Sequence, residues 1–324
     1  MRISRIASVA AVSALAGLAS AQCGSKPSNE RAESRGYGVV LASDSDHHGH
    51  QGPDSIVEVA QSAGTFNTLI AAVQAAGLAE TLMGEGPFTV FAPSDEAFAK
   101  LPAGTVESLL KKENLGTLRA ILTYHVVPGR FTADDVSSLS NAATANGQRV
   151  DFAVGSWGVR VDNARVVTAN IEAENGIIHV IDSVIMPETQ NIVGVADAAG
   201  SFSTLIAAAK AAGLAGALSG EGPLTVLAPT DEAFQKLPRG TVASLLKPEN
   251  RDQLAAILKL HVIPGRVYSD QALAAQRGDT LNGQPVTFRI DGGTPKVNGA
   301  TILTTDIEAS NGVIHVIDTV LIPG

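Results

Sequence analysis

Cysteine is nearly absent from this chain, which has one, Cys23, among 324 residues. A single thiol cannot form a disulfide within its own chain, so cross-links are excluded as a source of stability. Aromatic residues are also few, at 4%, but hydrophobic residues make up 45%, many of them Ala and Val. We therefore expect globular domains that are stabilised by packing alone.

Blocks of basic residues are missing as well. The chain has 23 Lys and Arg against 32 Asp and Glu, a formal net charge of -9 and a pI near 5.2. Without clustered positive charge it has no electrostatic footprint for nucleic acid or an anionic membrane surface. The sequence also lacks a Gly-x-Ser-x-Gly elbow, a His-Glu-x-x-His helix and a phosphate-binding glycine loop. We predict no nucleic-acid partner, no cofactor, no metal and no enzymatic activity.

The one long hydrophobic run lies at the start of the chain, from Ile6 to Leu18. Two arginines precede it and a segment of small residues, Ala19 to Ala21, follows, which is the pattern of a secretory signal peptide. The run is too short for a membrane span. We predict that residues 1–21 are removed before Gln22 and that the protein is secreted, extracellular or periplasmic. A lipid anchor at Cys23, which would hold it at the cell surface, is the alternative.

Residues 22–53 are small, polar and aperiodic, which predicts a flexible tether. Within this segment DSDHHGH, from Asp44 to His50, gathers three histidines and two carboxylates, which are ligands that first-row metals accept. A metal site also needs fixed geometry and supporting hydrogen bonds. We therefore expect a solvated linker here, without a metal site.

The rest of the chain is a duplication. GTFNTLIAAVQAAGL, from Gly64, recurs as GSFSTLIAAAKAAGL from Gly200, 136 positions later (200 − 64 = 136). EGPFTVFAPSDEAFAKLP and EGPLTVLAPTDEAFQKLP keep the same spacing. A unit of this length can form its own core. We predict two domains, residues 54–187 and 190–323, joined only by the dipeptide between them.

Each copy has a helical pattern first and a strand pattern later. Phe66, Leu69, Ile70 and Val73 recur at helical spacing, and Gly77 is the expected terminator. Later, Asn-Gly and Gly-Ser turns separate runs rich in Val, Ile and Thr. The copy closes on IIHVIDSVIMP, which is typical of a strand buried on both faces. The predicted class is α+β, with several short helices packed against a β-sandwich wedge in each of two tandem domains.

Three motifs in a fixed order carry a family resemblance. TVFAPSDEAF, TYHVVPG and NGIIHVIDSVIMP in the first copy recur as TVLAPTDEAF, KLHVIPG and NGVIHVIDTVLIP in the second. Each unit resembles a fasciclin-like domain, and the resemblance covers nearly the whole chain after the tether. It implies the wedge fold, adhesion to a cell-surface or matrix protein or polysaccharide, and no catalysis. Two linked domains could add avidity.

Two short stretches are candidate contact sites. The resemblance implies cell-surface binding for a Tyr-His pair, which is present as Tyr124-His125 and becomes Leu260-His261 in the second copy. Structural burial of this pair is the alternative. Arg277-Gly278-Asp279 follows an expected helix over 270–276, and we expect a loop that displays it as an integrin ligand. The alternative is that Gly278 and Asp279 are present because both residue types are common in turns.

Polar residues that recur at matched positions have a structural explanation. Asp95 and Asp231 could act as acids or bases, but each follows a residue suited to a helix N-cap, Ser94 or Thr230, in a first turn that favours negative charge. A cap and first-turn role explains them without any reaction. The recurring histidines, which we interpret as core residues bonded to nearby backbone groups, are His125, His179, His261 and His315.

Three functions follow from these observations. The first is an exported adhesion protein that binds through exposed loops. The second is a carrier that holds an apolar small molecule in a crevice between the helices and the wedge, although alanine-rich helices can also simply pack closely. The third is a hydrolase that uses His125 or His179.

Overall fold

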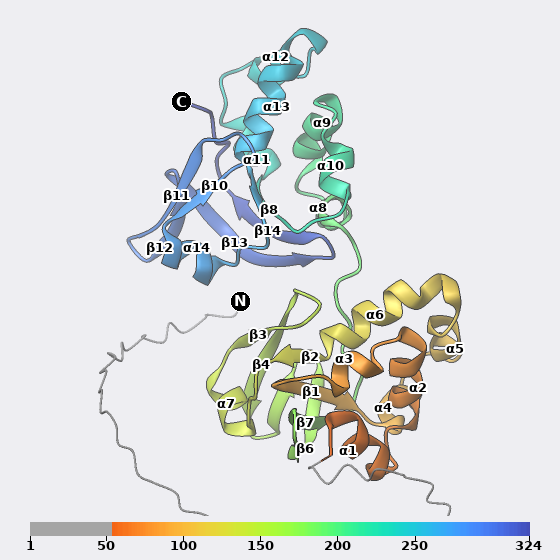
Figure 1. Ribbon diagram of the computed structural model, residues 1–324. Coiled ribbons are helices and arrows are strands. Elements are labelled where there is room, and N and C mark those ends of the chain that lie inside the picture. Colours follow the sequence, from red (N-terminus) through yellow and green to blue (C-terminus); the bar gives the residue numbers. More distant parts are fainter. Residues whose placement is uncertain (1–53) are drawn as a thin grey trace, which may run out of the picture. The chain divides into compact units, whose positions relative to one another are not determined.

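The computed structural model describes residues 54–324. The predicted leader, Cys23 and the tether with its histidine-rich stretch lie outside the described residues. Figure 1 shows the first repeat in orange to green and the second in green to blue, each with its own helices and strands. No helix within residues 54–324 has the length and apolar character needed to cross a membrane.

In the first repeat the helices precede most of the strands. Its helices are α1 (Ile56–Ala63), α2 (Asn67–Ala76), α3 (Ala79–Met83), α4 (Asp95–Ala99), α5 (Thr105–Leu109), the 3-10 helix η1 (Lys112–Asn114), α6 (Leu115–Tyr124) and α7 (Ala133–Ser138). Its strands are β1 (Phe88–Pro93), β2 (Val126–Pro128), β3 (Asn141–Ala143), β4 (Arg149–Gly155), β5 (Gly158–Val161), β6 (Ala164–Ala173) and β7 (Gly176–Ile181).

The second repeat follows the same series. Its helices are α8 (Ile192–Ala199), α9 (Ser203–Ala211), α10 (Ala215–Ser219), α11 (Asp231–Gln235), α12 (Thr241–Leu245), the 3-10 helix η2 (Pro248–Asn250), α13 (Arg251–Leu260) and α14 (Ser269–Ala275). Its strands are β8 (Leu224–Pro229), β9 (Val262–Pro264), β10 (Arg277–Asp279), β11 (Pro285–Asp291), β12 (Thr294–Val297), β13 (Ala300–Ala309) and β14 (Gly312–Ile317). The predicted α+β class is confirmed.

Local chemistry explains where the first helices begin and end. The apolar spacing that predicted a helix before Gly77 belongs to α2, and Gly77 ends it with a left-handed φ of 68°. The sequence pattern did not predict α1. This helix begins with a capping box in which the Ser55 hydroxyl accepts from the Glu58 amide and the Glu58 carboxylate accepts from the Ser55 amide. It ends at Gly64, which is also left-handed.

The sheet of each repeat curls into a wedge. In the first repeat the strand order is β2-β1-β7-β6-β5-β4-β3, and β1 and β7 pair in parallel at its core. Three strands lie between β1 and β4, yet the rings of Phe91 and Phe152 have centroids 5.7 Å apart. Just beyond β3, the N–H of Ala145 donates to the carbonyl of Val126 in β2 at 2.7 Å. The two ends of the sheet therefore meet. In the second repeat the N–H of Leu281 makes the matching bond to Val262 at 2.8 Å.

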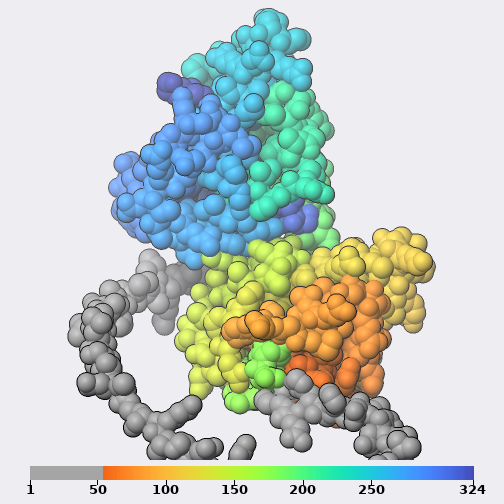
Figure 2. Space-filling view, viewed as in Figure 1, coloured from red at the N-terminus to blue at the C-terminus, as the bar shows by residue number. Residues whose placement is uncertain are grey.

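Two hydrophobic cores hold each repeat together. In the first repeat a helix–sheet core lies between the helices and the part of the sheet around strands β1 and β7, and a wedge core fills the inside of the curled sheet. Full burial of each large apolar side chain contributes about 1.5–3 kcal/mol, so these cores dominate stability. All six residues of β7 are buried, as predicted for a strand buried on both faces, but β7 ends at Ile181 and the rest of the predicted run, to Pro187, is not a strand. In the second repeat the first helices, in green, lie directly against the later helices and strands, in cyan to blue (Figure 2).

Candidate functional site

His179 of β7 and His315 of β14 are each 1% exposed and are bonded at both ring nitrogens. Nε2 of His179 lies 2.9 Å from the carbonyl oxygen of Phe131, and Nδ1 accepts from the N–H of Asn170 at 3.4 Å. Nε2 of His315 lies 2.9 Å from the Val267 carbonyl oxygen, and Nδ1 accepts from the backbone N–H of Asp306 at 3.2 Å. Because the carbonyls can only accept, Nε2 carries the proton in both rings. Burial lowers the pKa of both histidines, which keeps the rings neutral.

His125 and His261 follow the ends of α6 and α13 and are buried as well. Nδ1 of His125 lies 2.8 Å from the carbonyl oxygen of Ile121, one turn earlier, and Nε2 accepts from the N–H of Ile185 at 3.3 Å. His261 makes the same pair of bonds to Ile257 and Leu321. Burial lowers the pKa of each histidine to about 4. Each ring joins a helix end to the segment that follows the last strand.

The four histidine rings are poorly placed to act as general acids or bases. A general base needs a free nitrogen within reach of a substrate proton, but in all four histidines of residues 54–324 both nitrogens are engaged by backbone groups. No group of three or more His, Cys, Asp or Glu side chains in this part of the chain is placed to hold a metal ion. The arrangement is that of hydrogen-bonded links inside a core.

Tyr124 lies beside His125 and is 6% exposed. Its hydroxyl is 2.9 Å from a carboxylate oxygen of Asp162 and 3.0 Å from the carbonyl oxygen of Arg149. Burial and the neighbouring carboxylate raise the pKa of Tyr124, so the phenol stays protonated and can donate. The ring packs in the wedge core, as does Leu260 at the matching place in the second repeat. The Tyr-His pair is therefore inside the first repeat and not on its surface.

The Arg277-Gly278-Asp279 tripeptide forms strand β10, so the expectation of a loop is wrong. It pairs antiparallel with Pro285–Thr287 of β11 and stands at one end of the strand order. The side chains of Arg277 and Asp279 are 66% and 82% exposed and form an ion pair at 3.3 Å. A Cβ on Gly278 would lie 2.8 Å from the side chain of Ile263. A strand forms here because the backbone completes the curled sheet, which the three residues alone do not reveal.

Ser94 and Asp95 begin α4 but act on two different helices. The Ser94 hydroxyl accepts from the Ala97 amide at 3.3 Å and caps α4. The Asp95 carboxylate instead accepts from the backbone amides of Asn67 at 3.2 Å and Thr68 at 2.8 Å, at the start of α2. Burial acts to raise the pKa of Asp95, but the bonds from Thr68 and Asn67 outweigh it and lower that pKa. Helix α2 has no cap of its own, so Asp95 supplies one from a distant segment.

The second repeat has the same two caps, with Thr230 in place of Ser94 and Asp231 in place of Asp95. Thr230 caps α11 through the Ala233 amide at 3.2 Å. Asp231 accepts from the amides of Ser203 and Thr204 at the start of α9, at 3.2 and 2.7 Å. Matched bonds in both copies indicate that these aspartates position helices.

Replacing Asp95 with Ala is expected to lower the free energy of unfolding of the first repeat by about 1–2 kcal/mol, because α2 loses its N-terminal acceptor. Urea unfolding, followed through the spectroscopic signal of helical structure, measures the change in the free energy of unfolding. The control is Glu96→Ala, which also removes a carboxylate from the first turn of α4 but from an exposed position. An equal loss of unfolding free energy in the two variants would contradict the conclusion that Asp95 caps α2.

Asn175 and Asn311, each before the last strand of its repeat, are residues whose role the sequence did not indicate. The Asn175 side chain accepts from the Ile56 amide at 2.9 Å and donates to the carbonyls of Leu82 and Gly84 at 2.8 and 2.9 Å. It therefore ties the start of α1 and the end of α3 to β7. Asn311 makes the equivalent three bonds. The Asn-Gly dipeptide predicted only a turn, since these partners lie far away in the sequence.

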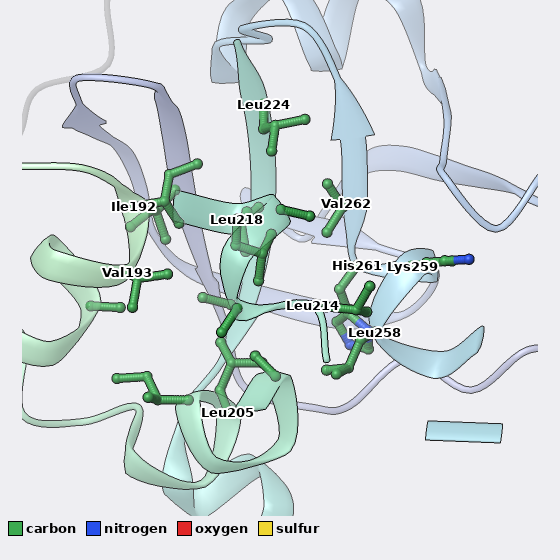
Figure 3. Close-up of a pocket in the computed structure, with 18 of the residues that line it drawn as sticks. Ile192, Val193, Leu205, Leu214, Leu218, Leu224, Leu258, Lys259, His261 and Val262 are labelled. Atoms are coloured by element: carbon green, nitrogen blue, oxygen red, sulfur yellow. The ribbon is translucent and has the colours of Figure 1, made fainter. Parts of the chain in front are cut away.

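The second repeat contains an apolar cavity of about 180 Å³ in its helix–sheet core. Figure 3 shows side chains from several elements facing one space, among them Ile192, Leu205 and Leu218. The equivalent space in the first repeat is about 40 Å³. Of the two apolar spaces, the one in the second repeat has room for another small molecule.

Comparison with known proteins agrees with the duplicated architecture. The model of the fasciclin domain matches residues 64–187 and 200–323. Protein sll1483 of Synechocystis sp. is 56% identical over 133 residues, which cover 41% of this chain and 73% of that protein. Transforming growth factor-beta-induced protein ig-h3 of Sus scrofa is 36% identical over 244 residues, 74% of this chain and 35% of the relative.

Two further comparisons span both repeats. Periostin of Homo sapiens is 32% identical over 260 residues, which cover 77% of this chain and 30% of periostin. A solved FAS1 domain pair from the insect cell adhesion molecule Fasciclin I is 19% identical with a TM-score of 0.41, over 81% of this chain and 98% of that one. This chain spans about a third of ig-h3 and of periostin. Because the family model matches both repeats over most of their length, the chain belongs to the fasciclin family, with two tandem fasciclin domains.

Proposed function

We propose that this chain is an exported adhesion protein whose two fasciclin domains bind a cell-surface or matrix partner. Family membership and the leader pattern at residues 1–21 support the proposal. The observation that carries it is the contrast between the buried histidines and the exposed charged side chains of β10. The four histidines that were candidates for acid–base chemistry are buried and bonded to backbone groups. The charged side chains of Arg277 and Asp279, in contrast, are both exposed to solvent. The proposal gives the chain no catalytic role.

The exposed face of β10 is the proposed contact within the second domain. An exposed ion pair contributes about 0–1 kcal/mol, so a partner can replace the bond between Arg277 and Asp279 at little cost. The partner would offer a cation or metal to the carboxylate and an acceptor to the guanidinium. Tyr124 and His125 are not assigned to the contact, because both are buried and bonded within the first domain.

The test is binding of the purified chain to surface and matrix fractions of the cells that produce it. We expect saturable binding, reduced about tenfold or more by the double variant Arg277→Asn, Asp279→Ala. The variant is matched to the protein itself, because the first domain has Asn141 and Ala143 at these strand positions. Unchanged binding by the variant would remove β10 from the contact. Absence of saturable binding by the unaltered chain would contradict adhesion itself.

A further inference from the structure

The cavity of the second domain lies between helices and sheet. Its walls come from α8, α9, α10 and α13 on the helical side and from β8, β9 and β14 on the sheet side. Residues that line it include Ile192, Leu205, Ala209, Leu218, Val226 and Leu258. Figure 3 shows that these surroundings are almost all carbon. The space reaches the surface near Leu281, which is 48% exposed.

The two polar residues at this cavity do not make it polar. His261 touches it, but both of its ring nitrogens are bonded, to the Ile257 carbonyl and the Leu321 amide. Lys259 stands at the rim, and Figure 3 shows its nitrogen pointing away from the space. A water inside would therefore lack the two to four polar partners that buried water needs.

Two residue differences between the domains favour the larger cavity of the second domain. Many positions around the two spaces carry the same side chains, for example Leu69 and Leu205. Val73 on α2, however, is replaced by Ala209 on α9, which removes two methyl groups from the wall. Phe88, which packs against the first helix–sheet core, is replaced by the smaller Leu224. The second domain therefore has room, about 180 Å³ against 40 Å³, that the first domain fills with its own side chains.

We propose that the second fasciclin domain binds a compact, uncharged apolar molecule in this cavity and that the first domain does not. A dry cavity of about 150 Å³ lined by Leu, Ile and Phe is large enough for benzene. The ligand class is thus an aromatic ring or short hydrocarbon group without hydrogen-bonding atoms, since the walls offer such atoms no partner. The site is independent of the proposed contact at β10.

The experiment uses the full chain with labelled Ile, Leu and Val methyl groups, titrated with benzene and followed by NMR. We expect saturable shifts at the methyls of Leu205, Leu218 and Val226, and none at their first-domain counterparts. Phenol, similar in size but with a hydroxyl group, is expected to bind about tenfold more weakly. Equal affinity for benzene and phenol would overturn the apolar site, as would the absence of saturable shifts with benzene.

Ala209→Val tests the location. It restores the side chain of the first domain and is expected to weaken benzene binding about tenfold or more, because the added methyls occupy the cavity. Ala207→Val is the matched control, since it makes the same change at an exposed position of α9 and should leave binding unaltered. Unchanged affinity of a folded Ala209→Val chain would overturn the assignment. The phenol comparison needs no variant, so it decides the chemistry even if Ala209→Val does not fold.

Discussion

Gly176→Ala is expected to unfold the first domain and to leave the second one folded. A Cβ on Gly176 would lie 2.0 Å from the carbonyl oxygen of Phe88 and 2.7 Å from the Ile56 side chain. That carbonyl belongs to β1, the parallel partner of β7. Neither strand can move without breaking the ladder at the centre of the domain, so we expect a loss of more than about 4 kcal/mol.

Calorimetry with domain-resolved NMR would measure this effect. In the variant the signals of the first domain should collapse at a temperature where those of the second are unchanged, because each domain has its own sheet and cores. Gly116→Ala is the control within the same domain. Apart from its chain neighbours and the backbone of its own helix, no atom lies within 4 Å of a Cβ at this α6 position, so alanine there should be neutral or stabilising by about 0.5–1 kcal/mol. A Gly176→Ala chain as stable as the unaltered protein would contradict the close approach of β1 and β7.

Both domains are also expected to lose stability as the pH falls from 6.5 towards 4. His125 and His261 have a pKa of about 4 in the folded chain against an ordinary value of 6.5. Between these values the unfolded chain binds more protons than the folded chain, so stability rises with pH and is lost on acidification. Each pKa unit corresponds to 1.36 kcal/mol, which gives about 3 kcal/mol for each of these histidines. His179 and His315 act in the same direction, since burial lowers the pKa of each.

Urea unfolding at several pH values between 7.5 and 4.5 measures the slope before most carboxylates titrate. His125→Gln should flatten the pH dependence of the first domain only, and His261→Gln that of the second only, so each variant is a control for the other. The glutamine variants should also be less stable at neutral pH, by about 1–3 kcal/mol. The reason is that each substitution alters the hydrogen bonds from the ring to the end of the preceding helix and to the segment after the last strand. An unaltered slope in both variants would show that these histidines titrate alike in the folded and unfolded chain.

Because the chain is duplicated, each position in one domain can be compared with the matching position in the other. Where the copies carry the same residue, as at Asp95 and Asp231, the bonds are the same. Where they differ, as at Val73 and Ala209, the structure differs in the volume of the adjoining cavity. The second domain also has Arg277 and Asp279 in place of Asn141 and Ala143. We therefore look for specific function at the differences, and for folding determinants at the matches.

The sequence by itself determined the features that depend on neighbours along the chain. Helix α2 with its end at Gly77 and the buried strand β7 follow from local spacing, because the apolar period and the left-handed glycine act within a few residues. The duplication follows from the recurrence of the same motifs in the second half of the chain, and the α+β class from the order of helix and strand patterns in each copy. Only the tertiary structure decided which segments meet. Asp95 caps α2 from 27 residues away and Asn175 bonds Ile56 across 119. The tripeptide at 277–279 is a strand because β11 lies next to it, and Ala209 borders a cavity because the elements around it do not fill the space. Such contacts depend on the curled sheet and its packing, which no local pattern specifies.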